Sequence, residues 1–116
     1  MKRKRVVITG MGAVCGNAAD AAEFAQALFA GKSGIKKCTA FDATGLSTDA
    51  FGEVDGLGEN RFFELLEKST AEMLVSAGVG AEEIASWGRG CRLFFGTLIF
   101  GADYFLRHSM AKSPVL

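Results

Sequence analysis

A run of β-branched residues that leads directly into a cluster of glycines is the feature that most restricts the fold of this chain. Arg5–Ile8 is apolar after its first residue, and glycines follow at positions 10, 12 and 16. A short apolar run that ends in glycines is typical of a buried strand entering a tight loop. The sequence therefore predicts a first strand over Arg5–Ile8 and a close-packed loop after it.

A helix is expected directly after this loop. Apolar residues recur at helical spacing through Ala21–Phe29. Asn17 is the expected cap, and the carboxylate of Asp20 can reach the free amides of the first turn. Gly31 stands where a left-handed C-terminal residue is needed. The pattern predicts a helix of about three turns.

Residues 32–58 have no sustained period and predict an irregular region with a short strand near Phe51–Val54. The strongest helical periodicity follows, with Asn60 as the expected cap and Gly78 as the expected stop. We expect one face of this helix to be buried. The expected buried stripe comprises Phe62, Leu65, Leu66, Met73 and Leu74.

The last third of the chain predicts a short helix over Ala81–Trp87, a buried strand over Arg92–Thr97 and a final helix over Ala102–Ser109. Strands that alternate with helices indicate an α/β fold with a mostly parallel sheet and right-handed crossovers. Two or three strands make a poor sheet. We therefore expect residues 1–116 to form a single partial domain.

The glycines after the first strand invite comparison with dinucleotide-binding loops. The third glycine of G-x-G-x-x-G falls on Cys15, and the reductase pattern T-G-x-x-x-G-x-G would need glycine at Val14. The one candidate acidic partner, Asp42, lies in the irregular region. Both patterns fail, so a small nicotinamide-dependent reductase is the least favoured function.

Three cysteines and one histidine are the residues most capable of chemistry. Cys15, Cys38 and Cys91 lie far apart in sequence without a C-x-x-C pair, and His108 offers one imidazole, so a structural zinc site is not expected. Cys15 fits a packed loop, Cys91 the start of a buried strand, and His108 a solvent-facing helix position. We assign none of these four residues a catalytic, cofactor-binding or metal-binding role.

Charge and hydropathy exclude two other classes. Of 13 basic side chains, four are Lys2–Arg5, which leaves nine against 13 acidic ones and no broad positive surface for nucleic acid. The apolar run of Val6–Ile8 is shorter than the roughly 7–15 residues of a secretory signal. Leu93–Ala102 is well short of the roughly 20 residues that cross a membrane. We expect a cytoplasmic protein with no membrane partner.

Several separate segments of the chain resemble, in their order, segments at the N-terminus of a β-ketoacyl-acyl carrier protein synthase. The most specific are V-V-I-T-G-M-G-A-V at positions 6–14 and A-G-K-S-G-I at positions 30–35, and a looser likeness continues through A-E-M-L-V-S-A-G-V and F-F-G-T. The resemblance covers nearly the whole chain. It implies the N-terminal part of the first βαβ-type half of a thiolase-like fold.

The resemblance also implies an activity. Members of this family perform a decarboxylating Claisen condensation, in which an acyl group on a cysteine thiolate is attacked by malonyl on acyl carrier protein. That chemistry needs an activated thiolate, an oxyanion hole and two imidazoles. In the family these residues lie beyond the length of this chain, so we expect it to be inactive by itself and to need no cofactor.

Partners are implied in the same way, namely acyl carrier protein carrying acyl or malonyl groups and a second copy in a homo-oligomer. Four arginines could contact such a carrier, although no spacing singles out a pair. They are Arg61, Arg89, Arg92 and Arg107. The alternative from another class is a non-catalytic structural or assembly role for this segment.

Overall fold

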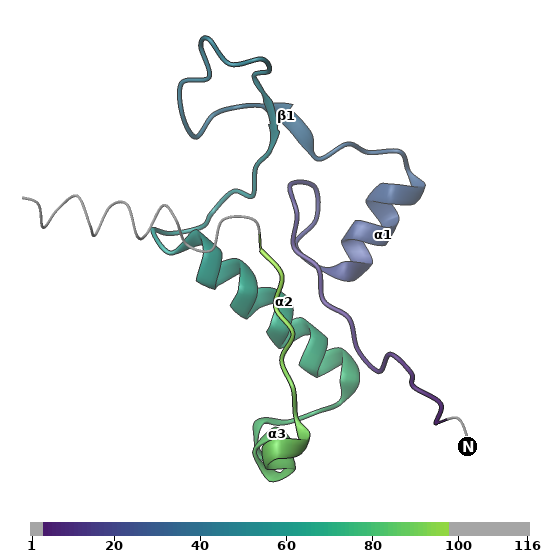
Figure 1. Cartoon of the computed structure of the whole chain (residues 1–116). Helices are drawn as coiled ribbons and strands as arrows, with labels where there is room; N and C mark the ends of the chain where they lie inside the picture. The colour runs from purple at the N-terminus through teal and green to yellow at the C-terminus, as the bar shows by residue number, and fades with distance from the viewer. Residues whose placement is uncertain (1–3, 98–116) are drawn as a thin grey trace, which may run out of the picture.

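The computed structural model describes residues 4–97, whose elements surround one long helix, α2 (Figure 1). α1 lies to one side of α2, the β hairpin lies beyond its N-terminal end, and α3 lies at its C-terminal end. The elements in chain order are α1 (Ala21–Phe29), β1 (Ile35–Lys37), β2 (Ala50–Gly52), α2 (Arg61–Ala77), α3 (Ala81–Trp87) and a 3-10 turn, η1 (Gly88–Gly90).

α1 occupies the predicted range, but Asp20 and not Asn17 is its cap. The Asp20 carboxylate accepts a hydrogen bond from the Glu23 amide at 2.7 Å. The side-chain amide of Asn17 instead donates to the Lys32 carbonyl at 2.7 Å and so joins the two ends of the α1 region. Gly31 has the expected left-handed conformation, with φ of 65°.

α2 confirms the predicted helix, with Asn60 at the cap position and Gly78 in the left-handed conformation that ends it. The Asn60 side chain forms no capping hydrogen bond. The Glu64 carboxylate instead accepts from the Gly58 amide at 3.0 Å. The stripe was expected to be buried. This prediction is wrong, because α2 has no buried residue and Met73 is 37% exposed.

The strands differ most from the prediction. β1 and β2 form an antiparallel pair with Lys36 opposite Phe51, so β2 overlaps the predicted strand near residue 51 and β1 was not predicted. Arg5–Ile8 and Arg92–Thr97 belong to no strand among residues 4–97, and both strand predictions are wrong for this range. The mostly parallel sheet is likewise not formed in this range, where the one sheet is antiparallel.

The residues that follow Arg5–Ile8 and the segment Arg92–Thr97 nevertheless run in the same direction along α2. Gly10 lies against the last turn of α2, and Gly12 lies against Ser69 in its middle. The chain returns from α3 to place the ring of Phe95 against Phe62 in the first turn of α2, with the ring centroids 5.6 Å apart. Both segments are therefore antiparallel to α2 and parallel to each other, as Figure 1 shows.

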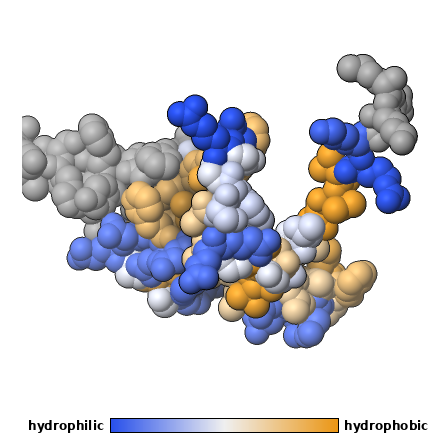
Figure 2. Space-filling view, turned by 90° about the horizontal axis from the view of Figure 1, so that it is seen from below, coloured by the Kyte–Doolittle hydropathy of each residue, from blue (hydrophilic) through white to orange (hydrophobic). Residues whose placement is uncertain are grey.

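Little of this arrangement is enclosed. Among residues 4–97 the buried residues are Ala18, Ala27 and Glu53, and each keeps some exposed surface. Figure 2 shows hydrophobic residues open to solvent at several places, including the run next to the basic N-terminal residues. The predicted helix Ala102–Ser109 lies outside the described residues.

Candidate functional site

The glycine segment after residue 9 is a packing surface for α2. A Cβ atom at Gly12 would overlap the Ser69 carbonyl oxygen, and one at Gly10 would overlap the Met73 carbonyl oxygen. These neighbours are backbone atoms in the middle of a helix, so they cannot turn aside as a side chain would. Glycine is required here because the N-terminal segment lies directly on the helix backbone.

Glu72 of α2 ties this segment to α1. One carboxylate oxygen of Glu72 accepts from the Ala13 amide and the other from the Ala21 amide, both at 2.8 Å. Ala21 is the first residue of α1, so the carboxylate also lies at the positive end of that helix. One side chain thus fixes the positions of three separate parts of the chain.

These contacts do not support the reductase hypothesis. In a dinucleotide-binding loop, glycines allow the pyrophosphate to approach and the next helix N-terminus receives its charge. Here the backbone of α2 lies against Gly10 and Gly12, and the carboxylates of Asp20 and Glu72 already accept amides of the first turn of α1. The hollow beside this segment is open and mostly apolar, with a volume of about 600 Å³.

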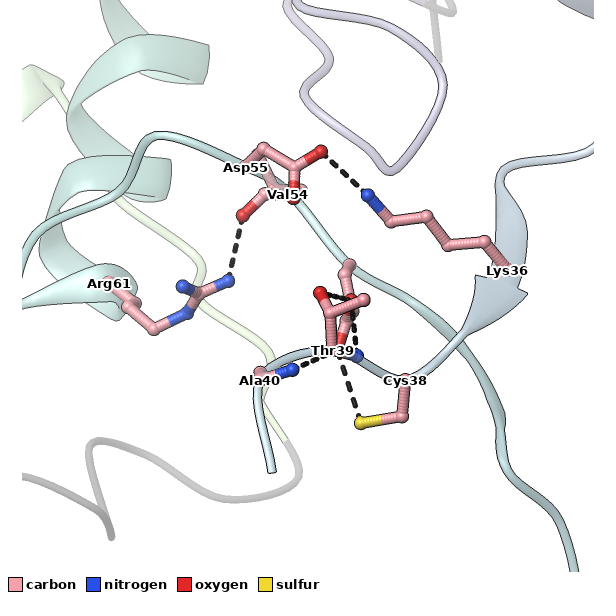
Figure 3. Close-up of polar contacts among 8 residues, drawn as sticks. Lys36, Cys38, Thr39, Ala40, Val54, Asp55 and Arg61 are labelled. Carbon is pink, nitrogen blue, oxygen red and sulfur yellow. Dashed lines mark hydrogen bonds and ion pairs between the residues drawn. The ribbon is translucent and has the colours of Figure 1, made fainter. Parts of the chain in front are cut away.

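A second polar centre surrounds the buried carboxylate of Glu53, directly after β2 (Figure 3). It accepts hydrogen bonds from the Ala40 amide at 2.9 Å, the Thr39 amide at 2.9 Å and the Thr39 hydroxyl at 2.8 Å. The Cys38 thiol also donates to it, at 3.2 Å. These donors, with the Ala40 amide first, lower the pKa of the Glu53 carboxyl from 4.5 to about 2.

The position of Glu53 predicts an acid transition in the hairpin. A folded pKa below the ordinary value means that Glu53 stabilises the fold fully above pH 4.5 and loses this contribution as the pH falls towards 2. We expect the amides of Thr39 and Ala40 to lose protection from hydrogen exchange in that window. The measurement is amide exchange by nuclear magnetic resonance as a function of pH.

Two variants isolate the contribution of Glu53. Glu53→Gln removes the titrating group, so the transition at these amides should disappear, whereas Asp55→Asn removes a surface carboxylate that pairs with Lys36 and should leave it in place. Asp42 titrates nearby, and its pKa is lowered by hydrogen bonds from the hydroxyl and amide of Thr44. An unchanged pH profile in Glu53→Gln would show that another group controls the hairpin.

The structure brings none of the candidate cysteines together. The Cys15 thiol donates to the side chain of Asn17 at 3.1 Å and is half-buried, as expected for a packed loop. Cys38 is half-buried beside Glu53. The buried-strand prediction for Cys91 is wrong, because this residue is exposed in an unpaired segment. His108 lies outside the described residues.

The arginines are equally dispersed. The Arg61 guanidinium donates to the Val54 carbonyl at 2.8 Å and holds the end of the hairpin against the start of α2. Arg92 donates to the carbonyls of Arg89 and Cys91, which are its own neighbours along the chain. Arg107 lies outside the described residues. Within residues 4–97 the Arg61 and Arg92 side chains have local partners, the Arg89 side chain forms no hydrogen bond or ion pair, and the three do not form a shared anion site.

Metal-binding clusters and membrane-spanning helices are both absent from the same residues. Within residues 4–97, no group of three or more cysteine, histidine or acidic side chains is placed to hold a metal ion. No helix in this part of the chain has the length and apolar character needed to cross a membrane.

The observed arrangement is a scaffold of helices and extended segments whose polar centres hold its own backbone in place. The chain matches the family model described as beta-ketoacyl synthase, N-terminal domain, over residues 3–113. It therefore belongs to the β-ketoacyl synthase family, which confirms the resemblance seen in the sequence. Family membership implies a thiolase-like fold for the domain to which these residues belong.

Two curated relatives support this assignment. The chain is 46% identical over 54 residues to 3-oxoacyl-[acyl-carrier-protein] synthase 2 of Coxiella burnetii, a match that covers 47% of this chain and 13% of the relative. It is 32% identical over 83 residues to 3-oxoacyl-[acyl-carrier-protein] synthase 2 of Vibrio cholerae, covering 70% of this chain and 20% of the relative. The matched residues thus span a fifth or less of these relatives. No solved structure matches the chain significantly.

Sequence reasoning missed the two residues that organise the polar contacts, Glu53 and Glu72. Glu72 stands at the edge of the helix face that carries the apolar stripe, next to Leu65 in projection. A carboxylate next to an apolar stripe is a signal that could have indicated a buried partner. Glu53 follows a strand of three residues and gives no comparable signal.

Proposed function

We propose that this chain is the N-terminal scaffold segment of a β-ketoacyl-acyl carrier protein synthase domain. The observation that carries the proposal is the family match over residues 3–113. The complete enzyme would condense an acyl group with malonyl on acyl carrier protein, with loss of carbon dioxide. The names of the two curated relatives favour chain elongation in fatty acid synthesis over polyketide synthesis.

The geometry supports a scaffold role. The segments that contain Val6–Ile8 and Leu93–Phe95 run in the same direction where residues 10–12 and Phe95 lie against α2, which is the arrangement of a strand–helix–strand unit. We propose that they become neighbouring parallel strands in the complete domain. Glu72 and the glycine segment then set the distance between the first strand and its covering helix.

We further propose that none of Cys15, Cys38, Cys91 or His108 takes part in the condensation. Cys15 and Cys38 donate to an amide oxygen and to a carboxylate, and neither contact supplies a base of the imidazole type. A thiolate nucleophile needs a positive neighbour or a helix N-terminus, and neither of these contacts supplies one. The proposed setting is a cytoplasmic homo-oligomer without a cofactor.

The test compares the chain alone with the same chain joined to the remainder of a relative. We expect the isolated chain to release no carbon dioxide from malonyl-acyl carrier protein above the buffer control, because it supplies neither nucleophile nor imidazole pair. We expect condensation to be retained when this chain replaces the matched N-terminal residues of the Vibrio cholerae relative in one polypeptide.

Two results would contradict the proposal. Turnover by the isolated chain that is abolished by Cys15→Ser, Cys38→Ser or Cys91→Ser would place the chemistry on this chain. A folded chimera that binds acyl carrier protein but cannot condense would show that this scaffold does not belong to an active synthase. Serine variants of all three cysteines that leave the chimera active would support the assignment of no catalytic role to them.

A non-catalytic assembly role is the second candidate. It is favoured by the exposed apolar segments Val6–Ile8 and Leu93–Phe94, which are suited to protein contacts and not to chemistry.

A further inference from the structure

Asp55 and Gly56 form the only Asp-Gly pair in the sequence and lie in the bend that joins the β hairpin to α2. Both residues are exposed, and the Asp55 side chain keeps 77% of its surface open to solvent. The pair belongs to no helix or strand among residues 4–97. In an Asp-Gly pair the side-chain carboxyl carbon can approach the next amide nitrogen closely, because glycine has no Cβ to obstruct it.

The backbone at Gly56 is free to react with this carboxyl group. The Gly56 amide donates no hydrogen bond among residues 4–97, so no bond must break before its nitrogen turns. Gly56 has φ of 72°, and a Cβ at this position would meet no other atom within 4 Å. The space around the residue is therefore open, and its backbone has a freedom that most side chains would remove.

The Asp55 carboxylate is held less firmly than other aspartates of the chain. Asp20 and Asp42 accept hydrogen bonds from backbone amides close in sequence, and both are followed by alanine. Asp55 instead pairs with the Nζ atom of Lys36 at 2.6 Å on the surface (Figure 3). Exposed ion pairs are weak, so this contact restrains the Asp55 carboxylate without fixing it.

We propose that Asp55–Gly56 is a site of spontaneous isomerisation to isoaspartate, restrained by the ion pair with Lys36. The Gly56 nitrogen bonds to the side-chain carboxyl carbon of Asp55, and the carboxyl hydroxyl leaves as water with the amide proton. Water then adds to the main-chain carbonyl carbon of the cyclic imide and breaks its bond to the Gly56 nitrogen. Gly56 is now joined through the side-chain carbon, and water is the one co-reactant.

This modification would loosen the connection between the hairpin and α2. The main chain gains one carbon at residue 55, next to the Val54 carbonyl that accepts the Arg61 guanidinium at 2.8 Å. The new carboxylate is attached directly to the α-carbon, so it lies further from Lys36 of β1. Both contacts that hold the segment between β2 and α2 are therefore weakened. The inference is independent of the proposed enzyme activity.

The experiment incubates chain 1–116 at neutral pH and measures isoaspartate as methyl groups transferred by an isoaspartyl carboxyl methyltransferase. Peptide mass spectrometry locates the modified residue. We expect isoaspartate at position 55 and not at Asp42 or Asp49, which precede alanine. Gly56→Asn should lower it to the level of those two residues, because asparagine tolerates the left-handed conformation while its side chain obstructs the attack.

Lys36→Gln and its matched control Lys37→Gln test the restraint, and circular dichroism verifies that both retain the helices. Lys37 is the next residue of β1 and forms no ion pair among residues 4–97. Lys36→Gln should form isoaspartate about two- to fivefold faster, the range set by the strength of an exposed ion pair. Lys37→Gln should react at the unaltered rate, and in concentrated urea all three chains should react alike. Equal rates for the two folded lysine variants would overturn the inference, as would isoaspartate that forms at position 55 in urea alone.

Discussion

Replacing Gly12 with alanine should destabilise the contact between the N-terminal segment and α2 by about 1–3 kcal/mol, the usual cost of forcing extra volume into a packed contact. The added Cβ would overlap the Ser69 carbonyl oxygen and lie 3.0 Å from the Met73 amide nitrogen. Both are helix backbone atoms, so the N-terminal segment itself must move away. That movement would also break the hydrogen bond from the Ala13 amide to Glu72.

Gly80→Ala is the matched control, because it adds the same atom at a glycine with φ of −93° and no other atom within 4 Å of its Cβ position. We expect this control to cost less than Gly12→Ala, about 1 kcal/mol or less, because Gly80 is the N-cap of α3 and alanine is only a weaker cap there. Both variants are compared with the unaltered chain in urea titrations followed by circular dichroism at one protein concentration. Equal midpoints for Gly12→Ala and Gly80→Ala would mean that the close contact at Gly12 is not required.

Local sequence signals predicted the helices well. α2 and α3 combine apolar periodicity with glycine at the stop position, and all the information that defines them lies within one or two turns. The error at the start of α1 has a local cause as well. Asn17 and Asp20 are both good caps, and the chain uses the nearer one while Asn17 bonds the Lys32 carbonyl 15 residues away.

The strands could not be predicted in the same way, because a strand exists only when a neighbour accepts its hydrogen bonds. Val6–Ile8 has the composition of a buried strand, yet residues 4–97 provide no strand beside it. The residues of β1 and β2 give only a weak strand signal, but Lys36 and Phe51 pair across the loop of residues 38–49. The composition of a segment therefore indicates its tendency to pair in a complete sheet, and not whether a partner strand is present.

The polar centres depend on contacts distant in sequence. Glu72 accepts from an amide 59 residues away and Glu53 from amides 13 and 14 residues away, and no local pattern specifies either pair. The absence of a catalytic assignment for the three cysteines, in contrast, followed from residue types and spacing. It remains a prediction that the activity comparison tests.

The largest expected effect is on the association state of the isolated chain. The described residues enclose little core, since among residues 4–97 the buried side chains are Ala18, Ala27 and Glu53. The exposed residues include the apolar segments Val6–Ile8 and Leu93–Phe94, and monomers rarely expose apolar patches larger than a few hundred Å². We therefore expect the chain without its complement to be oligomeric, domain-swapped or aggregated.

Charge should not prevent this association. The formal net charge is zero at neutral pH, so copies of the chain do not repel one another strongly. Val7→Asp adds charge to the exposed run and should reduce self-association, while Val75→Asp should reduce it less. Val75 is 82% exposed on α2, so Val75→Asp is the matched control, and circular dichroism verifies that both variants retain the helices.

Sedimentation equilibrium of the isolated chain at micromolar concentration tests the central claim most directly, namely that these residues form an incomplete part of a β-ketoacyl synthase domain. The predicted result is a mass distribution above that of the monomer, with unfolding that lacks a single cooperative transition. A single monomeric species of 12.3 kDa that unfolds cooperatively would show that the chain closes its own core, and would contradict the claim.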